Sequence, residues 1–155
     1  MRGALAGATL LLGVAVSAAE AQWPAAGERA TARARLGGMM LVLEAEAWVD
    51  RMPMALEATA SPAAPVMMSV RVVAESGPLP AGLAADSAWL RRGRRRWRGV
   101  PTAEQPPEAD RRAWMLRDLP SWVGDGPTDL LLRVRTPGSA PVLLRLTLPA
   151  PESVY

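Results

Sequence analysis

The sequence contains no cysteine, histidine, lysine or phenylalanine, and it has a single tyrosine. Without cysteine there is no disulfide framework and no thiolate nucleophile. Without histidine the chain lacks the usual general base and both common nucleophile–histidine pairs, and the missing lysine excludes a serine–lysine pair. These absences predict a protein that is not an enzyme and that uses no cofactor.

What is present is enough for one globular domain. The chain has 155 residues, half of them hydrophobic, which is sufficient for a single core. All eighteen cationic side chains are arginine, and the formal net charge is only +3 at pH 7. A net charge this small argues only weakly for a polyanionic partner, and nucleic acid is not expected. The clustering of arginine along the chain is more informative.

Residues 1–21 have the parts of a signal peptide in the right order. Arg2 supplies a positive charge, Ala4–Val16 is apolar, and a small-x-small cleavage pattern ends at Ala21, which makes Gln22 the first mature residue. The apolar run is shorter than the roughly 20 residues that span a bilayer. We therefore expect cleavage, no transmembrane segment in the mature protein, and a periplasmic or secreted location.

The rest of the chain is predicted to form one β-sandwich domain over residues 38–150, between a poorly structured lead-in at 22–37 and a tail at 151–155. Seven segments have the alternation or the flanking turn residues of strands. They are Met39–Asp50, Val66–Glu75, the two arms around Trp89 and Trp97, Asp129–Thr136, Val142–Leu148 and Arg111–Leu119. For Arg111–Leu119 a short helix is the alternative, and an extended segment is favoured. Frequent turn signals and the lack of amphipathic helices favour an antiparallel sandwich over a parallel α/β fold.

A family resemblance rests on the order of these segments. Two long strands are followed by a hairpin carrying Trp89 and Trp97, and then by the C-terminal hairpin of Asp129–Thr136 and Val142–Leu148. This order resembles small exported immunoglobulin-like or fibronectin-III-like β-sandwich proteins of bacteria. The resemblance implies an all-β, antiparallel, immunoglobulin-like sandwich of about seven strands, and it implies no particular activity.

Arginine is concentrated in Asp86–Val100, which is predicted to be a β-hairpin turning at Gly93 and Arg94, because glycine allows the positive φ of a tight turn. The candidate polyanion-binding residues are Arg91, Arg92, Arg94, Arg95, Arg96, Trp97 and Arg98. Guanidinium groups bind phosphate and sulfate through paired hydrogen bonds, and tryptophan suits a membrane interface. The sequence thus predicts a non-catalytic binding or scaffolding module of the cell envelope, contacting a polyanion or a protein. The alternative interpretation is a solvated hairpin tip, or a charged edge that blocks strand addition.

Methionine gives a second functional hypothesis. Thioethers favour Cu(I), and the candidate ligands of a periplasmic copper-binding protein are Met52, Met54, Met67 and Met68. Strand alternation sends Met67 and Met68 to opposite faces, however, so methionine as core filler is the competing interpretation.

Carboxylates give the remaining alternatives. Glu44 and Glu46 lie two apart on one strand face, about 6.5–7 Å between Cα atoms, a spacing compatible with glycosidase carboxylates but also typical of a solvated face. Asp118, Asp125 and Asp129 flank a glycine-containing loop, but their spacing matches no EF-hand. No metal site is assigned on this pattern.

Overall fold

The structure is a computed structural model, and it describes residues 22–50, 65–104 and 106–154. The expected signal peptide, Met52 and Met54 lie outside the described residues. The described part holds ten strands and two 3-10 helices. Their bounds are η1 Ala25–Arg29, β1 Arg33–Leu36, β2 Met39–Asp50, β3 Val66–Ala74, β4 Ala84–Arg92, β5 Arg95–Gly99, β6 Thr102–Ala103, β7 Arg111–Leu119, η2 Ser121–Asp125, β8 Thr128–Arg135, β9 Val142–Leu148 and β10 Glu152–Val154.

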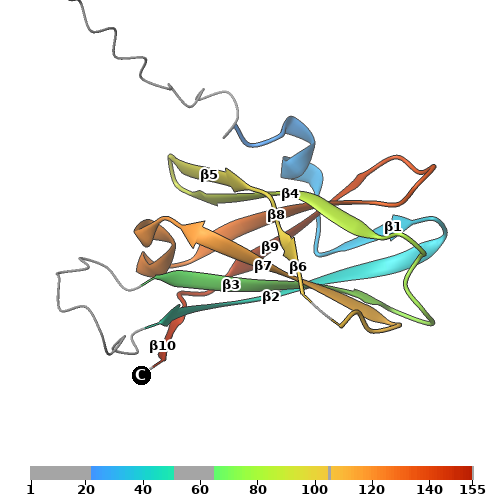
Figure 1. Ribbon diagram of the computed structural model, residues 1–155. Coiled ribbons are helices and arrows are strands. Elements are labelled where there is room, and N and C mark those ends of the chain that lie inside the picture. Colours follow the sequence, from blue (N-terminus) through green and yellow to red (C-terminus); the bar gives the residue numbers. More distant parts are fainter. Residues whose placement is uncertain (1–21, 51–64, 105, 155) are drawn as a thin grey trace, which may run out of the picture.

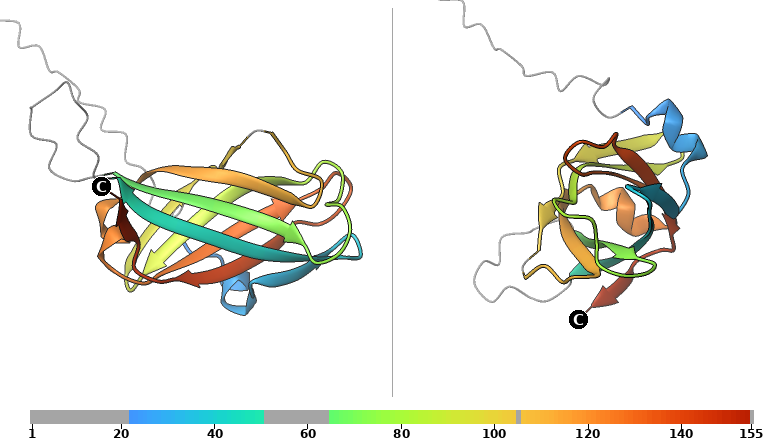
Figure 2. Two further views of the ribbon diagram at one scale, coloured as in Figure 1. Left: turned by 90° about the horizontal axis from the view of Figure 1, so that it is seen from below. Right: turned by 90° about the vertical axis from the view of Figure 1, so that its right-hand side faces the viewer.

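Two sheets pack face to face, one above the other in Figure 1 and seen obliquely from one end in the right-hand view of Figure 2. One sheet has the order β1-β2-β3-β7-β6, and β10 pairs with the same edge of β2 as β1 does. The other has the order β5-β4-β8-β9. Every strand pair is antiparallel except β10 with β2. The fold is therefore the all-β sandwich that the sequence predicts.

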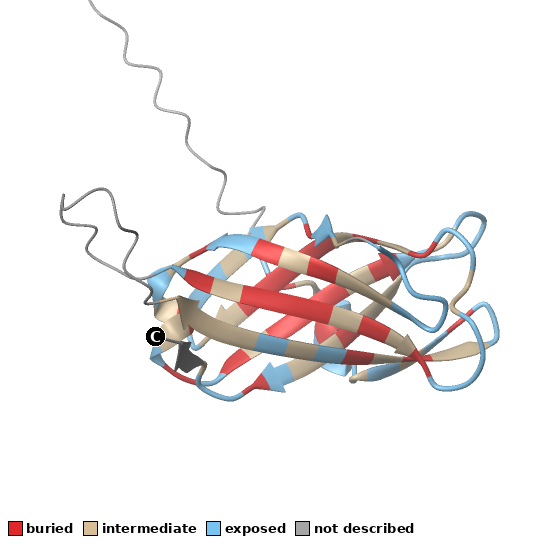
Figure 3. Cartoon of the chain, turned by 60° about the horizontal axis from the view of Figure 1, so that its bottom comes forward, coloured by how far each residue is buried: buried red, intermediate tan, exposed pale blue. Residues whose placement is uncertain are grey.

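The core lies between the two sheets, and alternation along each strand supplies it. In β8, Leu130, Leu132 and Val134 point between the sheets and are fully buried. In β2, Leu41 and Leu43 do the same, and the exposed Glu44 and Glu46 lie on the other face. Figure 3 shows buried and more exposed residues following one another along the strands. Burying one face of each strand is what fixes the register, because a slip of one residue would turn these leucines into water.

The seven predicted strands are all present, and those with predicted ends differ from the structure by at most one residue at either end. Three further strands were missed, namely β1, β6 and β10 with four, two and three residues. Segments this short show no recognisable alternation, and they form because neighbouring strands offer unpaired backbone groups.

The sandwich extends beyond both of its predicted boundaries, residues 38 and 150. In residues 22–37, which we expected to be poorly structured, the structure has η1 and β1, and Trp23 is only 6% exposed. Trp23 packs with Trp89 and Leu131 on the outer face of the β5-β4-β8-β9 sheet, which holds this segment in place. In the expected tail, β10 pairs with Trp48–Asp50 of β2.

Candidate functional site

The arginine-rich hairpin is formed as predicted by β4 and β5, and Gly93 in its turn has a φ of 59°. Leu90 pairs with Trp97, and both face the core. The alternate residues, including Arg96 and Arg98 of β5, therefore lie on the outer face of the sheet. Trp97 thus packs against the core, although the sequence placed it among the ligand-binding residues.

Arg91 is tied into the structure by two carboxylates. Its guanidinium donates hydrogen bonds to Glu28 of η1 and, at 3.2 Å, to Asp129 of β8, and it lies 4.3 Å from the centroid of the Trp23 ring. The hydrogen bond with Glu28 raises the pKa of Arg91, and the same bond lowers the pKa of Glu28. Arg91 therefore clamps η1 to the sheet and is not available to a ligand.

Asp129 is the centre of this network. Burial alone would raise its pKa, but hydrogen bonds from Thr147 at 2.6 Å, Arg91 and Arg145 at 2.9 Å outweigh burial, so the pKa lies below its ordinary value. The register explains the geometry, because Asp129 pairs with Arg91 on one side and with Thr147 on the other. One carboxylate thereby joins three neighbouring strands.

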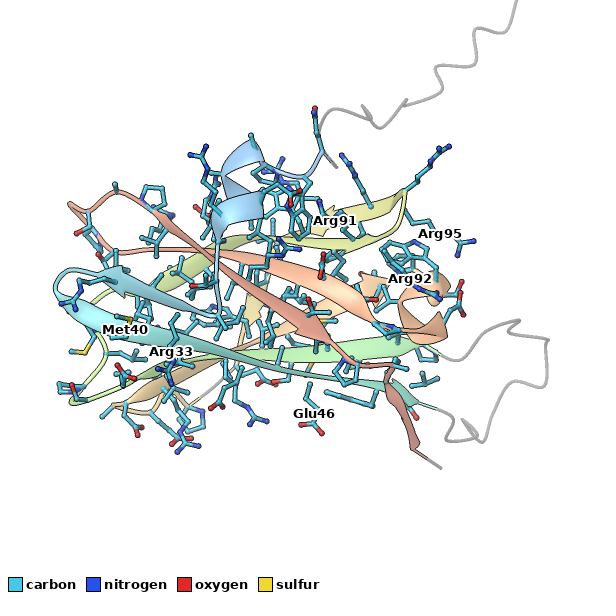
Figure 4. All side chains as sticks on the ribbon, turned by 180° about the vertical axis from the view of Figure 1, so that it is seen from behind. Arg33, Met40, Glu46, Arg91, Arg92 and Arg95 are labelled. Atoms are coloured by element: carbon cyan, nitrogen blue, oxygen red, sulfur yellow. The ribbon has the colours of Figure 1, made fainter. Side chains whose placement is uncertain are left out.

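Arg92 and Arg95 flank the turn of the hairpin, and there they meet η2 (Figure 4). Arg92 donates to the main-chain oxygens of Trp122 and Asp125 at 3.1 and 3.0 Å. The carboxylate of Asp125 lies 3.4 Å from Arg92 and 3.6 Å from Arg95. These two arginines therefore already have a carboxylate and carbonyl partners inside the protein.

The other three arginines of the hairpin, Arg94, Arg96 and Arg98, differ from Arg91, Arg92 and Arg95 in their partners. All three are exposed, and within the described ranges none of them has an acidic partner. Arg98 lies 5.4 Å from the centroid of the Trp89 ring and donates to Ser87 Oγ at 3.5 Å, which holds its guanidinium along the outer face. We call Arg94, Arg96 and Arg98 the hairpin triad. The candidate contact surface narrows to this triad from the six arginines that the sequence predicted.

The methionine candidates do not come together in the described residues. Met68 is fully buried in the core, whereas Met67 faces outward across from Trp48. The two thioethers thus lie on opposite faces of β3, as alternation predicts.

The acidic candidates are likewise dispersed. Asp125 and Asp129 form ion pairs with Arg92 and Arg145 respectively. The described part of the chain has no group of three or more acidic residues placed to hold a metal. Glu44 and Glu46 are exposed on the outer face of β2, as the alternation predicts, and Glu46 lies 3.8 Å from Arg71 of β3.

A groove on the opposite side of the molecule was not predicted. It includes a cavity of about 710 Å³ on the outer face of β2, β3 and β7, lined by Trp48, Ser69, Met115 and the segment from Pro149 to Pro151 among others. Its walls come from five separate segments of the sequence, so no local pattern could have revealed it. In Figure 4, Glu46 of this groove projects from the side opposite to the labelled hairpin arginines.

No protein-family model, no curated protein and no solved structure matches this chain. Within the described residues, no helix combines the length and the hydropathy that crossing a bilayer requires. Function has to be argued from the two outer faces of the sandwich.

Proposed function

We propose that this protein is a non-catalytic binding module that contacts a polyanion of the cell envelope through the hairpin triad. The observation that carries the proposal is the division of the hairpin arginines into two groups. Arg91, Arg92 and Arg95 have carboxylate partners, whereas the triad has none among the described residues. Exposed guanidinium groups without an internal carboxylate are the ones available for phosphate or sulfate.

The paired arginines support the triad by making it rigid. Arg91 and Arg92 are adjacent in β4 and contact η1 and η2 respectively, so the hairpin is held from two sides next to its turn. Arg96 and Arg98 share the outer face of β5 and stand about 7 Å apart along the strand. Arg98 is the triad member whose guanidinium is already positioned, by Ser87 and Trp89, so it loses less side-chain entropy when a ligand binds.

The envelope location in this proposal rests on residues 1–21, whose charged, apolar and small-residue parts are those of a cleaved signal peptide. An exported protein meets lipid phosphates and acidic polysaccharides before it meets nucleic acid.

The test measures retention on heparin and partitioning onto vesicles containing phosphatidylglycerol, for wild type and for Arg94→Ser/Arg96→Ser/Arg98→Ser. We expect the triad variant to elute from heparin at lower salt. On vesicles it should partition about a hundredfold more weakly, at about 1 kcal/mol per arginine near an anionic surface. The heparin and vesicle arms separate an acidic polysaccharide from a lipid headgroup.

The matched control is Arg33→Ser/Arg35→Ser/Arg117→Ser, which removes the same charge from exposed positions elsewhere. It should behave more like wild type than like the triad variant. If the two triple variants lose binding equally, the attraction is a property of net charge, and the triad is not a site.

A further inference from the structure

A β-bulge in β4 places two polar side chains on the outer face of the β5-β4-β8-β9 sheet. The register between β4 and β8 shifts between Ala85 and Ser87, which makes Asp86 an extra residue in β4. Ala85 and Ala88, on either side of the bulge, belong to the core. Asp86 and Ser87, between them, both accept hydrogen bonds from Arg133, which β8 directs outward. Bulges of this kind aim side chains and often lie next to functional sites.

Two guanidinium groups converge on the hydroxyl of Ser87. Its Oγ accepts a hydrogen bond from Arg133 at 3.3 Å and another from Arg98 of β5 at 3.5 Å. The serine is only 2% exposed, so it is a fixed point beneath the two long side chains. A hydroxyl oxygen has two acceptor positions, and cations take both of them here. Two positive groups are thus held close together.

The ring of Trp89 lies beside both guanidinium groups. The guanidinium carbons of Arg98 and Arg133 are 5.4 Å and 5.7 Å from the ring centroid. Contact with an aromatic ring orients a guanidinium, and Trp89 is itself buried. Within the described residues, the hydrogen bonds that these two arginines donate go only to Ser87 and Asp86. Each guanidinium has five N–H donors, so most of them remain for a ligand.

Positive charge exceeds negative charge at this point of the sheet. In the described part of the chain, Asp86 is the one carboxylate that pairs here, and it is shared between Arg133 at 2.6 Å and Arg135 at 3.2 Å. Arg98 has no carboxylate partner in that part, and Arg96 lies two residues away on the same face of β5. Like charges held this close repel each other, so an anion bound among them is favoured.

We propose that Ser87, Arg98 and Arg133 form a binding site for a phosphate monoester, and we call these three residues the bulge site. A monoester carries a charge of about −1.5 to −2 at pH 7 and has three terminal oxygens, enough for both guanidinium groups to bind it. A phosphodiester has a single charge and two such oxygens, so it gains less from two converging guanidinium groups. Because Arg98 also belongs to the hairpin triad, the bulge site rests on the polyanion proposal and narrows its ligand to one kind of anion.

The test compares vesicles containing phosphatidic acid, whose headgroup is a monoester, with vesicles containing phosphatidylglycerol, whose headgroup is a diester. Both are diluted with phosphatidylcholine to the same electrophoretic mobility, so that the surface charge is equal. We expect the mature protein to partition about tenfold more strongly onto phosphatidic acid, the effect of about one additional hydrogen bond to a charged group.

A second arm of the test identifies the source of the phosphate. Glycerol 1-phosphate is titrated into the protein while the NMR signals of the arginine Nε–H groups and of the Trp89 indole are followed. Saturable shifts of the Arg98 and Arg133 signals mean that the site takes a soluble monoester, with or without a preference on vesicles. A preference on vesicles without such shifts means that the monoester has to be presented on a lipid.

Three variants separate the bulge site from net charge. Arg98→Gln should reduce the preference for phosphatidic acid from about tenfold to none. Arg96→Gln is its matched control, since it removes the same charge from the same face of β5 away from Ser87, and it should keep the preference. Ser87→Ala changes no charge but releases the two guanidinium groups, so the preference should fall to about threefold. Far-UV circular dichroism and the Tm check that each variant folds.

Equal partitioning of wild type onto the two kinds of vesicle, with no saturable shift, would overturn the bulge site. The polyanion proposal survives that result if the hairpin-triad variant still elutes from heparin at lower salt than wild type. An undiminished preference in folded Arg98→Gln and Ser87→Ala would also overturn the bulge site, because the phosphate then binds elsewhere. The reverse outcome is that wild type and the hairpin-triad variant behave alike on heparin while Arg98→Gln loses the glycerol 1-phosphate shifts. In that case the bulge site stands and the polyanion proposal fails.

Discussion

Asp129 shows how much of this fold is decided by a single side chain. It accepts hydrogen bonds from three residues on β4 and β9, and one of them, Arg91, also holds Glu28 of η1. Replacing the carboxylate leaves Arg91 and Arg145 sharing Glu28 alone. Stability should therefore depend on the ionisation of Asp129.

We predict that Asp129→Asn lowers the free energy of unfolding by about 2 kcal/mol at pH 6, the scale of hydrogen bonds to a charged group. Because the pKa of Asp129 is lowered in the folded state, the ionised carboxylate stabilises the fold above its ordinary pKa of 3.8. That contribution is lost as the pH falls through the lowered folded-state pKa. Urea unfolding of both proteins from pH 6 to pH 2 should show their difference shrinking from about pH 4 downward.

Asp110→Asn is the control, since Asp110 is exposed and lies 3.7 Å from Arg111. Its effect should stay below about 0.5 kcal/mol at every pH. A difference between wild type and Asp129→Asn that persists unchanged at pH 2 would show that shape, and not charge, is what Asp129 contributes.

For single residues, the sequence predicted burial that depends on neighbours in the same strand. It missed contacts between strands that are far apart in the sequence. Alternation placed Leu41 and Leu43 inside and Glu44 and Glu46 outside, because each depends only on its neighbours in the strand. The pairing of Arg91 with Asp129 depends on the register between β4 and β8, which lie far apart in the sequence. The sequence around Ser69 gives no sign of the cavity, since distant segments form its other walls.

Among the elements, the η1 segment is attached from outside the sandwich. It is held by the small cluster of Trp23, Trp89 and Leu131, and by the hydrogen bond that Arg91 donates to Glu28. The main core lies on the other side of the sheet and does not include these three residues. The segment should therefore be able to detach without unfolding the sheets.

We predict that Trp23→Ala detaches η1 while the sandwich stays folded. Removing a buried tryptophan from a small cluster should cost at most about 3 kcal/mol, because the detached segment leaves no closed cavity behind. Limited trypsin digestion should then cleave after Arg29 sooner than in wild type, while the remainder of the chain resists. Mass spectrometry of the products locates the first cut.

Trp48→Ala, on the outer face of the other sheet, is the control and should leave cleavage after Arg29 unchanged. If Trp23→Ala instead makes the whole chain degrade at once, η1 is part of the cooperative unit and its attachment is not local.

Strands were predicted well where they are long or where a turn residue lies beside them. The hairpin at Gly93 and the strand Met39–Asp50 were found, since a glycine turn and a long alternating run are local signals. Trp23 is the one local signal that the segment containing η1 is ordered, because a large apolar side chain is usually buried in a folded protein. That place, Leu131 on the outer face of β8, is visible only once the sheet is formed.

For the whole molecule, the two outer faces have opposite chemistry around one shared core. The β5-β4-β8-β9 sheet displays the hairpin triad, and the β2–β3–β7 face has the acidic groove over Ser69. The scaffolding role that we propose would use such an outer face as its contact surface. Such a scaffold needs its sheets to behave as one rigid body, so the core between them should unfold cooperatively.

Leu131 and Leu132 test this cooperativity, because both are fully buried but face opposite sides of β8. We predict that Leu132→Ala, in the shared core, costs about 3–4 kcal/mol, and that Leu131→Ala costs about 2 kcal/mol because η1 can shift to close the space. In urea, far-UV circular dichroism and tryptophan fluorescence of Leu132→Ala should give one coincident transition at a lower midpoint. Two separated transitions would mean that the sheets unfold independently, and the two faces would then not be held in a fixed relation.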